Sequence, residues 1–186
     1  MNTWIALFKG INVGGNNKIP MKELVSEFQA LGFLAVKSYI QSGNVVFQTS
    51  ATDVRSEANS LSTIIAAAVH SRFNITTHVI VLSQIDLAQA ISANPFTEVQ
   101  SDEEAKQLHL FFLKHPATRF DQSRLDSTKK PSERWEFKGG IFYLHTPDGF
   151  GESKLAMQVE KIVGVPVSAR NWRTIGALFK LASTLG

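Results

Sequence analysis

The side chains that could bind a ligand gather in two stretches, and the first of them is rich in glycine and asparagine. It reads G-I-N-V-G-G-N-N-K at residues 10–18 and lies between an apolar segment and a helical pattern. Glycine permits positive φ and leaves backbone N–H groups accessible, and a helix N-terminus carries partial positive charge, so an anion could bind there. The spacing differs from a Walker A loop, because Lys18 comes two positions too late and no Ser or Thr follows it. Two interpretations stay open: an anion site, or a tight loop whose asparagines cap its own turns.

The second stretch joins D-G-F-G-E-S-K-L at residues 148–155 to S-A-R-N-W at residues 168–172. Ser153 and Asn171 each precede a helical pattern. Their short polar side chains are typical of helix N-caps, where an oxygen accepts a backbone N–H bond. This structural role needs no ligand.

Two cations in this second stretch are expected to have a negatively charged partner. Lys154 and Arg170 lie close to predicted helix N-termini, where positive charge is unfavourable unless an anion accompanies it. The anion could be Asp148 or Glu152, in a structural ion pair. It could also be a bound phosphate or carboxylate.

No recognisable catalytic constellation appears elsewhere, so catalytic residues and cofactors stay unidentified. The chain has no cysteine, which excludes disulfides, thiol nucleophiles and thiolate metal sites. It has no G-x-S-x-G motif. Its five histidines lack metal-ligand spacing, so no metal site is expected; they are His70, His78, His109, His115 and His145.

The elements that must position these residues repeat the same order in both halves: strand, helix, strand, strand, helix, strand and a trailing helix. In the first half we expect strands at residues 3–9, 36–41, 45–49 and 75–82, with helices after Pro20, over 54–68 and over 85–93. In the second half we expect strands at 107–114, 134–138, 141–146 and 165–169, a helix or turn within 116–126, and helices at 153–163 and after Asn171. Ser83 and Asp86 resemble the cap of the helix at 85–93.

This order predicts an α+β protein of two tandem ferredoxin-like βαββαβ plaits. Each plait would be an antiparallel sheet in spatial order 4-1-3-2, with both plait helices on one face and a trailing helix. We expect domains at residues 1–94 and 105–186. The stretch 94–104 between them holds Pro95 and an acidic run, which favours a linker.

The topology should gather the polar residues at the ends of the two sheets. In a plait, the loop after strand one lies at the same end as the turn between strands two and three, and strands three and four finish together at one end. The candidate ligand-binding residues are therefore Lys9, Asn12, Asn17, Lys18, Gln41, Ser42 and Asn44 from the first half, and Lys154, Arg170 and Asn171 from the second.

Composition and charge suggest a cytoplasmic protein without a membrane segment. No run approaches 18 apolar residues, and the N-terminus lacks the basic region and cleavage site of a signal peptide. The formal net charge is +3. The basic excess lies at the C-terminus, where five Lys or Arg face Glu160 alone from residue 153 onward. A positive balance weakly favours anionic partners.

Several short motifs give the chain a resemblance to the DUF1697 family of uncharacterised bacterial proteins over nearly its whole length. They are L-F-K-G-I-N-V-G-G at residues 7–15, Y-I-Q-S-G-N-V-V-F at 39–47, N-P-F at 94–96, S-K-L at 153–155 and A-R-N-W-R-T at 169–174. The resemblance implies a tandem of ferredoxin-like subdomains and no particular activity.

The leading hypothesis is that the protein binds an anionic small molecule or nucleotide in a cleft between the two plaits. An alternative is a nucleic-acid-binding protein that uses the basic C-terminal region. A third is an enzyme of unassigned reaction, for which the sequence identifies no general base. The sequence leaves the oligomeric state open.

Overall fold

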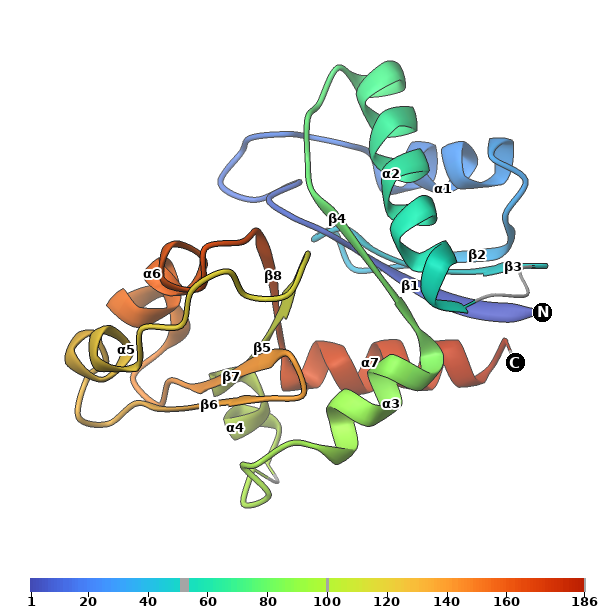
Figure 1. Ribbon diagram of the computed structural model, residues 1–186. Helices are drawn as coiled ribbons and strands as arrows, with labels where there is room; N and C mark the ends of the chain where they lie inside the picture. The colour runs from blue at the N-terminus through green and yellow to red at the C-terminus, as the bar shows by residue number, and fades with distance from the viewer. Residues whose placement is uncertain (51–53, 100, 186) are drawn as a thin grey trace. The chain divides into compact units, whose positions relative to one another are not determined.

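The computed structural model describes residues 1–50, 54–99 and 101–185 and has an α+β fold (Figure 1). The first half contains β1 (Asn2–Phe8), α1 (Met21–Ala30), β2 (Leu34–Tyr39), β3 (Asn44–Thr49), α2 (Val54–Phe73), β4 (Val79–Ser83) and α3 (Gln84–Ser92). The second half contains α4 (Asp102–Gln107), β5 (Leu108–Leu113), α5 (Gln122–Thr128), β6 (Arg134–Lys138), β7 (Ile141–His145), the 3₁₀ turn η1 (Phe150–Glu152), α6 (Lys154–Val163), β8 (Val167–Asn171) and α7 (Trp172–Ser183).

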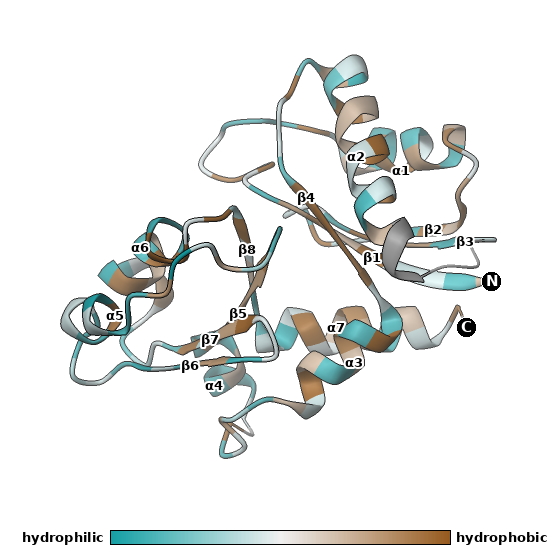
Figure 2. Ribbon diagram, viewed as in Figure 1, coloured by the Kyte–Doolittle hydropathy of each residue, from teal (hydrophilic) through white to brown (hydrophobic). Residues whose placement is uncertain are grey.

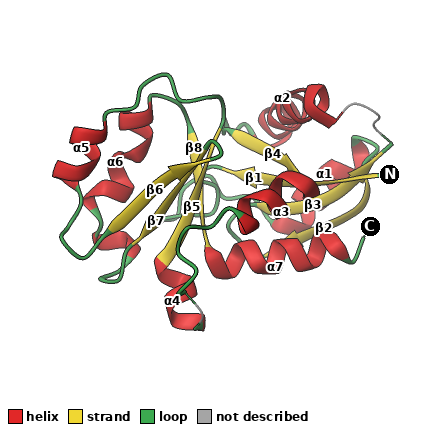
Figure 3. Ribbon diagram, turned by 60° about the horizontal axis from the view of Figure 1, so that its bottom comes forward, coloured by secondary structure: helices red, strands yellow, loops and turns green. Residues whose placement is uncertain are grey.

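The strands form two four-stranded sheets, and both have the order predicted for a plait. The first sheet runs β2-β3-β1-β4 and the second β6-β7-β5-β8, with every neighbouring pair antiparallel (Figure 3). The prediction of tandem ferredoxin-like plaits is therefore confirmed.

The first sheet buries both of its faces. On one face, Trp4 and Phe8 of β1 pack with Phe28 of α1 and with residues of α2. The residues that alternate with them, Ile5 and Leu7, point to the other face because side chains alternate along a strand, and they are also fully buried.

The far end of the chain covers that second face. Gln48, which is paired in register with Thr3, donates a hydrogen bond of 2.7 Å to the carbonyl of Leu185 and another of 3.2 Å to the Thr3 hydroxyl. Leu178 and Ala182 are fully buried on the amphipathic helix α7, on which hydrophobic and hydrophilic residues alternate (Figure 2). The first sheet thus depends on a residue that lies 137 positions beyond Gln48 in the chain.

The chain accordingly divides into two compact units, and one of them is built from two separate stretches of the sequence. One unit is Met1–Ala88 with Ala177–Gly186, and the other is Gln89–Gly176. The domains expected at 1–94 and 105–186 stay a prediction. Part of the expected linker, 94–104, is the helix α4, and residue 100 lies outside the described residues.

The second sheet also has two buried faces. Phe111, Phe142 and Val167 pack with Leu125 of α5 and Leu155 of α6 on one face. On the opposite face the buried residues are Leu110, Phe112, Tyr143 and Ser168, which alternate with the first set. Within the described ranges, no helix has the length and apolar character needed to cross a membrane.

Candidate functional site

The glycine- and asparagine-rich loop of the first unit is a miniature hairpin. The amide of Asn12 donates to the carbonyl of Asn17 at 3.1 Å, and that of Asn16 to Val13 at 3.2 Å. The two central residues, Gly14 and Gly15, have φ of 60° and 81°. Two consecutive positive φ values define a type I′ turn, which strongly favours glycine. The glycines are therefore explained by backbone geometry.

The side chain of Asn12 links this hairpin to the turn between β2 and β3 by hydrogen bonds. Its side-chain amide nitrogen donates to the carbonyls of Ile19 at 2.9 Å and Gln41 at 2.8 Å, and its oxygen accepts from the amide of Ile19 at 2.8 Å. The two segments that topology predicted to meet do meet. The Asn12 side chain is used to hold them together, which supports the structural interpretation of the loop asparagines.

Two further candidates in this unit also bind backbone. Asn17 donates to the carbonyl of Gly10 at 3.2 Å. Asn44 is fully buried and donates to the carbonyl of Tyr39 at 3.2 Å and to the Ser42 hydroxyl at 3.1 Å. These contacts stabilise the loop and the turn locally.

The remaining candidates of the first unit are more accessible. Lys18 and Gln41 are exposed, while Lys9 and Ser42 are half-buried. Together they place two ammonium groups and two neutral polar side chains on a hairpin and a turn that Asn12 joins. This arrangement could bind an anion through charge and hydrogen bonds.

In the second unit, strands β7 and β8 finish at the same end of the sheet, as the plait order requires. Both run antiparallel to β5: His145 of β7 pairs with Leu108, and Asn171 of β8 pairs with the next residue, His109. The segments after β7 and β8 therefore begin at this same end of the sheet, one on each side of β5.

Both predicted N-caps are present at this end. The Ser153 hydroxyl accepts a bond of 3.0 Å from the amide of Ala156 at the start of α6, and Ser153 is fully buried. The Asn171 side-chain oxygen accepts a bond of 2.9 Å from the amide of Thr174 at the start of α7. Asn171 thus has a structural role that needs no ligand.

The structure separates the two predicted cations onto opposite faces of the sheet. Lys154 is exposed and begins α6, which packs on the face that bears Phe111 and Val167. Arg170 pairs in register with Leu110, so it lies on the other face. Asp148, the suggested acidic partner, instead accepts a 2.7 Å bond from Ser132.

Two of the acceptors that hold Arg170 are neutral oxygens. Its Nη1 donates to the hydroxyl of the buried Ser168 at 3.0 Å and to the carbonyl of Ala169 at 2.8 Å. The side chain is half-buried, and desolvation lowers the pKa of its guanidinium to about 10. Arg170 therefore stays charged at neutral pH in a poorly hydrated place.

Two histidines that sequence patterns dismissed are unusual in the structure. His109 is 9% exposed, and its ring stacks on Phe150 with 3.8 Å between centroids. Burial lowers its pKa to about 4. His145 receives a bond from Arg134, which also pairs with Glu98. Only register and tertiary contacts could identify these residues.

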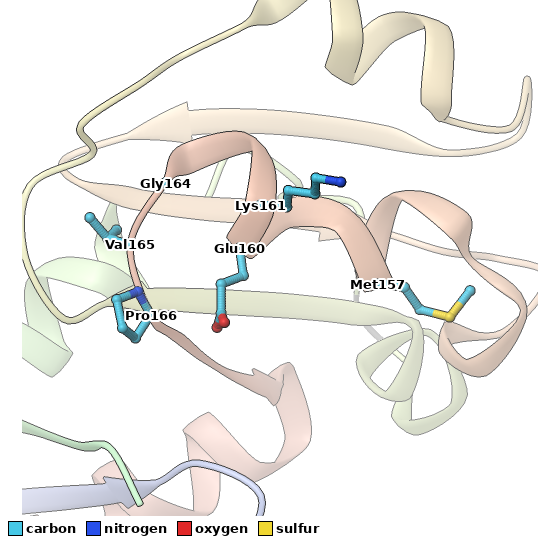
Figure 4. A pocket seen from close by; sticks show the side chains of 6 residues that line it. All are labelled: Met157, Glu160, Lys161, Gly164, Val165 and Pro166. Atoms are coloured by element: carbon cyan, nitrogen blue, oxygen red, sulfur yellow. The ribbon is translucent and has the colours of Figure 1, made fainter.

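A separate hollow of about 400 Å³ lies over α6 and the segment that follows it (Figure 4). Its lining residues are Met157, Glu160, Lys161, Gly164, Val165 and Pro166. The Glu160 carboxylate accepts a 3.0 Å bond from the amide of Val167. In Figure 4 the Lys161 side chain points away from the Glu160 carboxylate. Within this lining no candidate residue from the sequence is found. Among the described residues, no three His, Asp or Glu side chains form a group that could hold a metal.

Comparison with known proteins agrees with the fold. The structure is similar to that of the conserved bacterial protein SP0830 from Streptococcus pneumoniae, at 22% sequence identity and a TM-score of 0.66, covering 97% of this chain and 98% of that one. No match is found among curated proteins. The model of the family described as "Protein of unknown function (DUF1697)" matches residues 1–143. The chain belongs to the DUF1697 family.

Proposed function

We propose that this protein binds an anionic small molecule, one that carries a phosphate or carboxylate group, with Arg170 as the principal contact. The observation that carries the proposal is the half-buried guanidinium of Arg170, whose Nη1 is held in place by bonds to the Ser168 hydroxyl and the Ala169 carbonyl. A guanidinium also offers five N–H donors in a planar fork that matches carboxylate and phosphate.

The first unit contains a separate candidate contact for an anion. Lys18 and Gln41 are exposed on the segments that Asn12 joins, and Lys9 and Ser42 are half-buried beside them. A nucleotide carries phosphate groups, so it belongs to the proposed class of ligand for either contact. Asn12, Asn17 and Asn44 support these segments through the bonds described above, and Asn171 supports the start of α7 after β8.

Thermal unfolding with added inorganic phosphate, AMP or ATP tests the proposal. A ligand that binds only the native state at about 100 times its Kd stabilises that state by about 2.7 kcal/mol. We expect this gain in the wild type and its loss in Arg170→Met. The exposed neighbour Arg173 provides the control, and Arg173→Met should keep the response. An unliganded Arg170→Met protein as stable as the wild type would fit a binding role.

Two outcomes would contradict the proposal. One is that none of these anions raises the melting temperature of the wild type. The other is that Arg170→Met unfolds at lower temperature while the response to anions persists, which would make Arg170 a structural residue.

A second candidate function is nucleic-acid binding. It is favoured by the exposure of the basic residues near the C-terminus, namely Lys154, Lys161, Arg173 and Lys180. Salt separates the two functions, because contacts to several phosphates release counterions and give a steep dependence of affinity on salt concentration. A single anion contact at the half-buried Arg170 would show a shallow dependence.

A further inference from the structure

Arg134 attaches the segment between α3 and α4 to the second sheet. Its guanidinium carbon lies 5.1 Å from the centroid of the Phe96 ring, a cation–π distance, and it forms an ion pair with Glu98. The segment itself is ordered locally, because Asn94 accepts a 3.0 Å bond from the amide of Phe96. We call Phe96, Glu98, Arg134 and His145 the Arg134 clasp.

The fourth member, His145, lies next to Arg134 on the neighbouring strand. The two residues are paired directly in register on strands β6 and β7. Nη2 of Arg134 lies 3.3 Å from Nδ1 of His145. Because a guanidinium can only donate, Nδ1 must be the unprotonated nitrogen of a neutral ring. In the described part of the chain the other nitrogen, Nε2, is buried without a hydrogen-bond partner.

We propose that the Arg134 clasp is a pH-sensitive latch, which holds residues 94–99 against the second sheet when His145 is neutral and releases them when His145 is protonated. A proton on Nδ1 would point at the N–H groups of Arg134 and place two positive charges in contact. The guanidinium then has to leave the imidazole, and its contacts with Phe96 and Glu98 are disturbed with it.

The charges around His145 set the sign of the effect. Burial and the adjacent Arg134 lower the pKa of His145, while Glu98 and Glu104 raise it by a smaller amount. The pKa of His145 in the closed clasp is thus below the ordinary value of 6.5. Protons therefore bind better to the open clasp, so the closed clasp is fully stable above about pH 6.5 and loses stability as the pH falls.

Release would also alter a hollow beside the clasp. Phe96 and Arg134 line a space of about 420 Å³ together with Trp135, Lys129 and other residues of α5 and β6. Movement of Phe96 removes one wall of this space. The latch would therefore change the shape of a surface hollow in mildly acidic conditions.

Hydrogen exchange at two pH values tests the latch. The probes are the amides of Phe96 and Val99, whose protection factors are corrected for the intrinsic exchange rate. Between pH 7.5 and 5.5 we expect protection in the wild type to fall, by at most about tenfold for a histidine whose open-state pKa is about 6.5. His145→Gln, which can still accept from Arg134, should abolish the fall. The exposed His115 gives the control, and His115→Gln should behave as the wild type.

The proposal is overturned if wild-type protection at Phe96 and Val99 is the same at both pH values, or if His145→Gln keeps the fall. The amide of Leu110 in β5 is followed in parallel. Equal falls at Leu110 and Phe96 would report global unfolding and would also contradict a local latch.

A second measurement keeps the test valid if His145→Gln does not fold. The ring of His145 is titrated by NMR in two other variants. Arg134→Gln should raise its pKa and Glu98→Gln should lower it, since each removes one of the charges named above. Shifts of opposite sign, or none, would show that the clasp does not control this histidine.

Discussion

Gly43 is constrained by both a turn and the core of the first unit. Gly43 has φ of 73°, and a Cβ placed on it would lie 2.7 Å from side-chain atoms of both Ile11 and Phe8. Its carbonyl also accepts the amide of Phe8 at 2.9 Å. Backbone conformation and packing therefore both require glycine at this position.

Gly43→Ala is expected to destabilise the protein by more than backbone strain alone. Adoption of positive φ by a non-glycine residue costs on the order of 1–3 kcal/mol, and here a buried clash is added. Gly140→Ala is the matched control, because Gly140 has φ of 78° and no atom within 4 Å of the place that a Cβ would take. Chemical denaturation should show a larger loss for Gly43→Ala. Equal losses would mean that Ile11 and Phe8 move aside freely.

His109 should make stability depend on pH. Its pKa is lowered to about 4 in the folded protein and is 6.5 when unperturbed, so the unfolded chain binds a proton first as the pH falls. The free energy of unfolding should then decrease by about 2 kcal/mol between pH 7 and 4.5 on account of this residue. In His109→Phe, which can still stack on Phe150, that part of the decrease should vanish. Parallel pH profiles for the two proteins would contradict the prediction.

At the scale of elements, the helix ends are fixed by short polar side chains. The sequence suggested caps at Ser83, Ser153 and Asn171, and all three accept a backbone amide at 2.9–3.0 Å. Ser83 and Asp86 also bind each other reciprocally. The helix α4 was not predicted, although Ser101 and Glu104 form a complete capping box. The acidic residues that indicated a linker are favourable in the first turn of a helix.

The cap of α6 allows a direct measurement. Ser153→Ala removes the acceptor of the Ala156 amide in a fully buried place and should reduce the free energy of unfolding by about 1–2 kcal/mol. Ser26→Ala serves as the comparison, because Ser26 lies on the exposed side of α1 and donates to the carbonyl of Lys22 in the same helix. It should change stability by less than about 0.5 kcal/mol. A small effect at Ser153 would show that water or another group replaces the hydroxyl.

For the whole molecule, the division of the chain into units is decided by its last helix. Residues Ala177–Gly186 belong to the unit that begins at Met1. The bond from Gln48 to Leu185 fixes the end of the chain on the second face of the first sheet. That face also carries Ile5 and Leu7, which are fully buried.

Leu178→Ala should therefore weaken the first unit. Truncation of a fully buried leucine typically costs about 2–5 kcal/mol. Hydrogen exchange should show the loss of protection in β1 and β3, although residue 178 lies far from them in sequence. Met157→Ala provides a control, since Met157 is 70% exposed. Protection lost only in β5 and β7 would contradict the assignment of α7 to the first unit.

Local patterns along the sequence determined much of this protein. Apolar alternation, glycine turns and N-cap residues are read over a few positions, and they predicted the strand order of both sheets and the contact between the hairpin at residues 10–19 and the turn after β2. The type I′ turn at Gly14 and Gly15 is likewise a local feature, because two adjacent glycines are enough to favour it.

Only the tertiary structure decided what depends on distant neighbours and on the face of a sheet. A shift of one residue along β8 moves a side chain to the opposite face, so Arg170 and Lys154 are separated although their segments meet at one end. The burial that lowers the pKa of His109 and the place of α7 in the first unit arise between residues far apart in the chain. The contact of Arg134 with His145 depends on the register of the β6–β7 hairpin. Desolvation and packing are properties of those three-dimensional surroundings, and a short sequence window does not contain them.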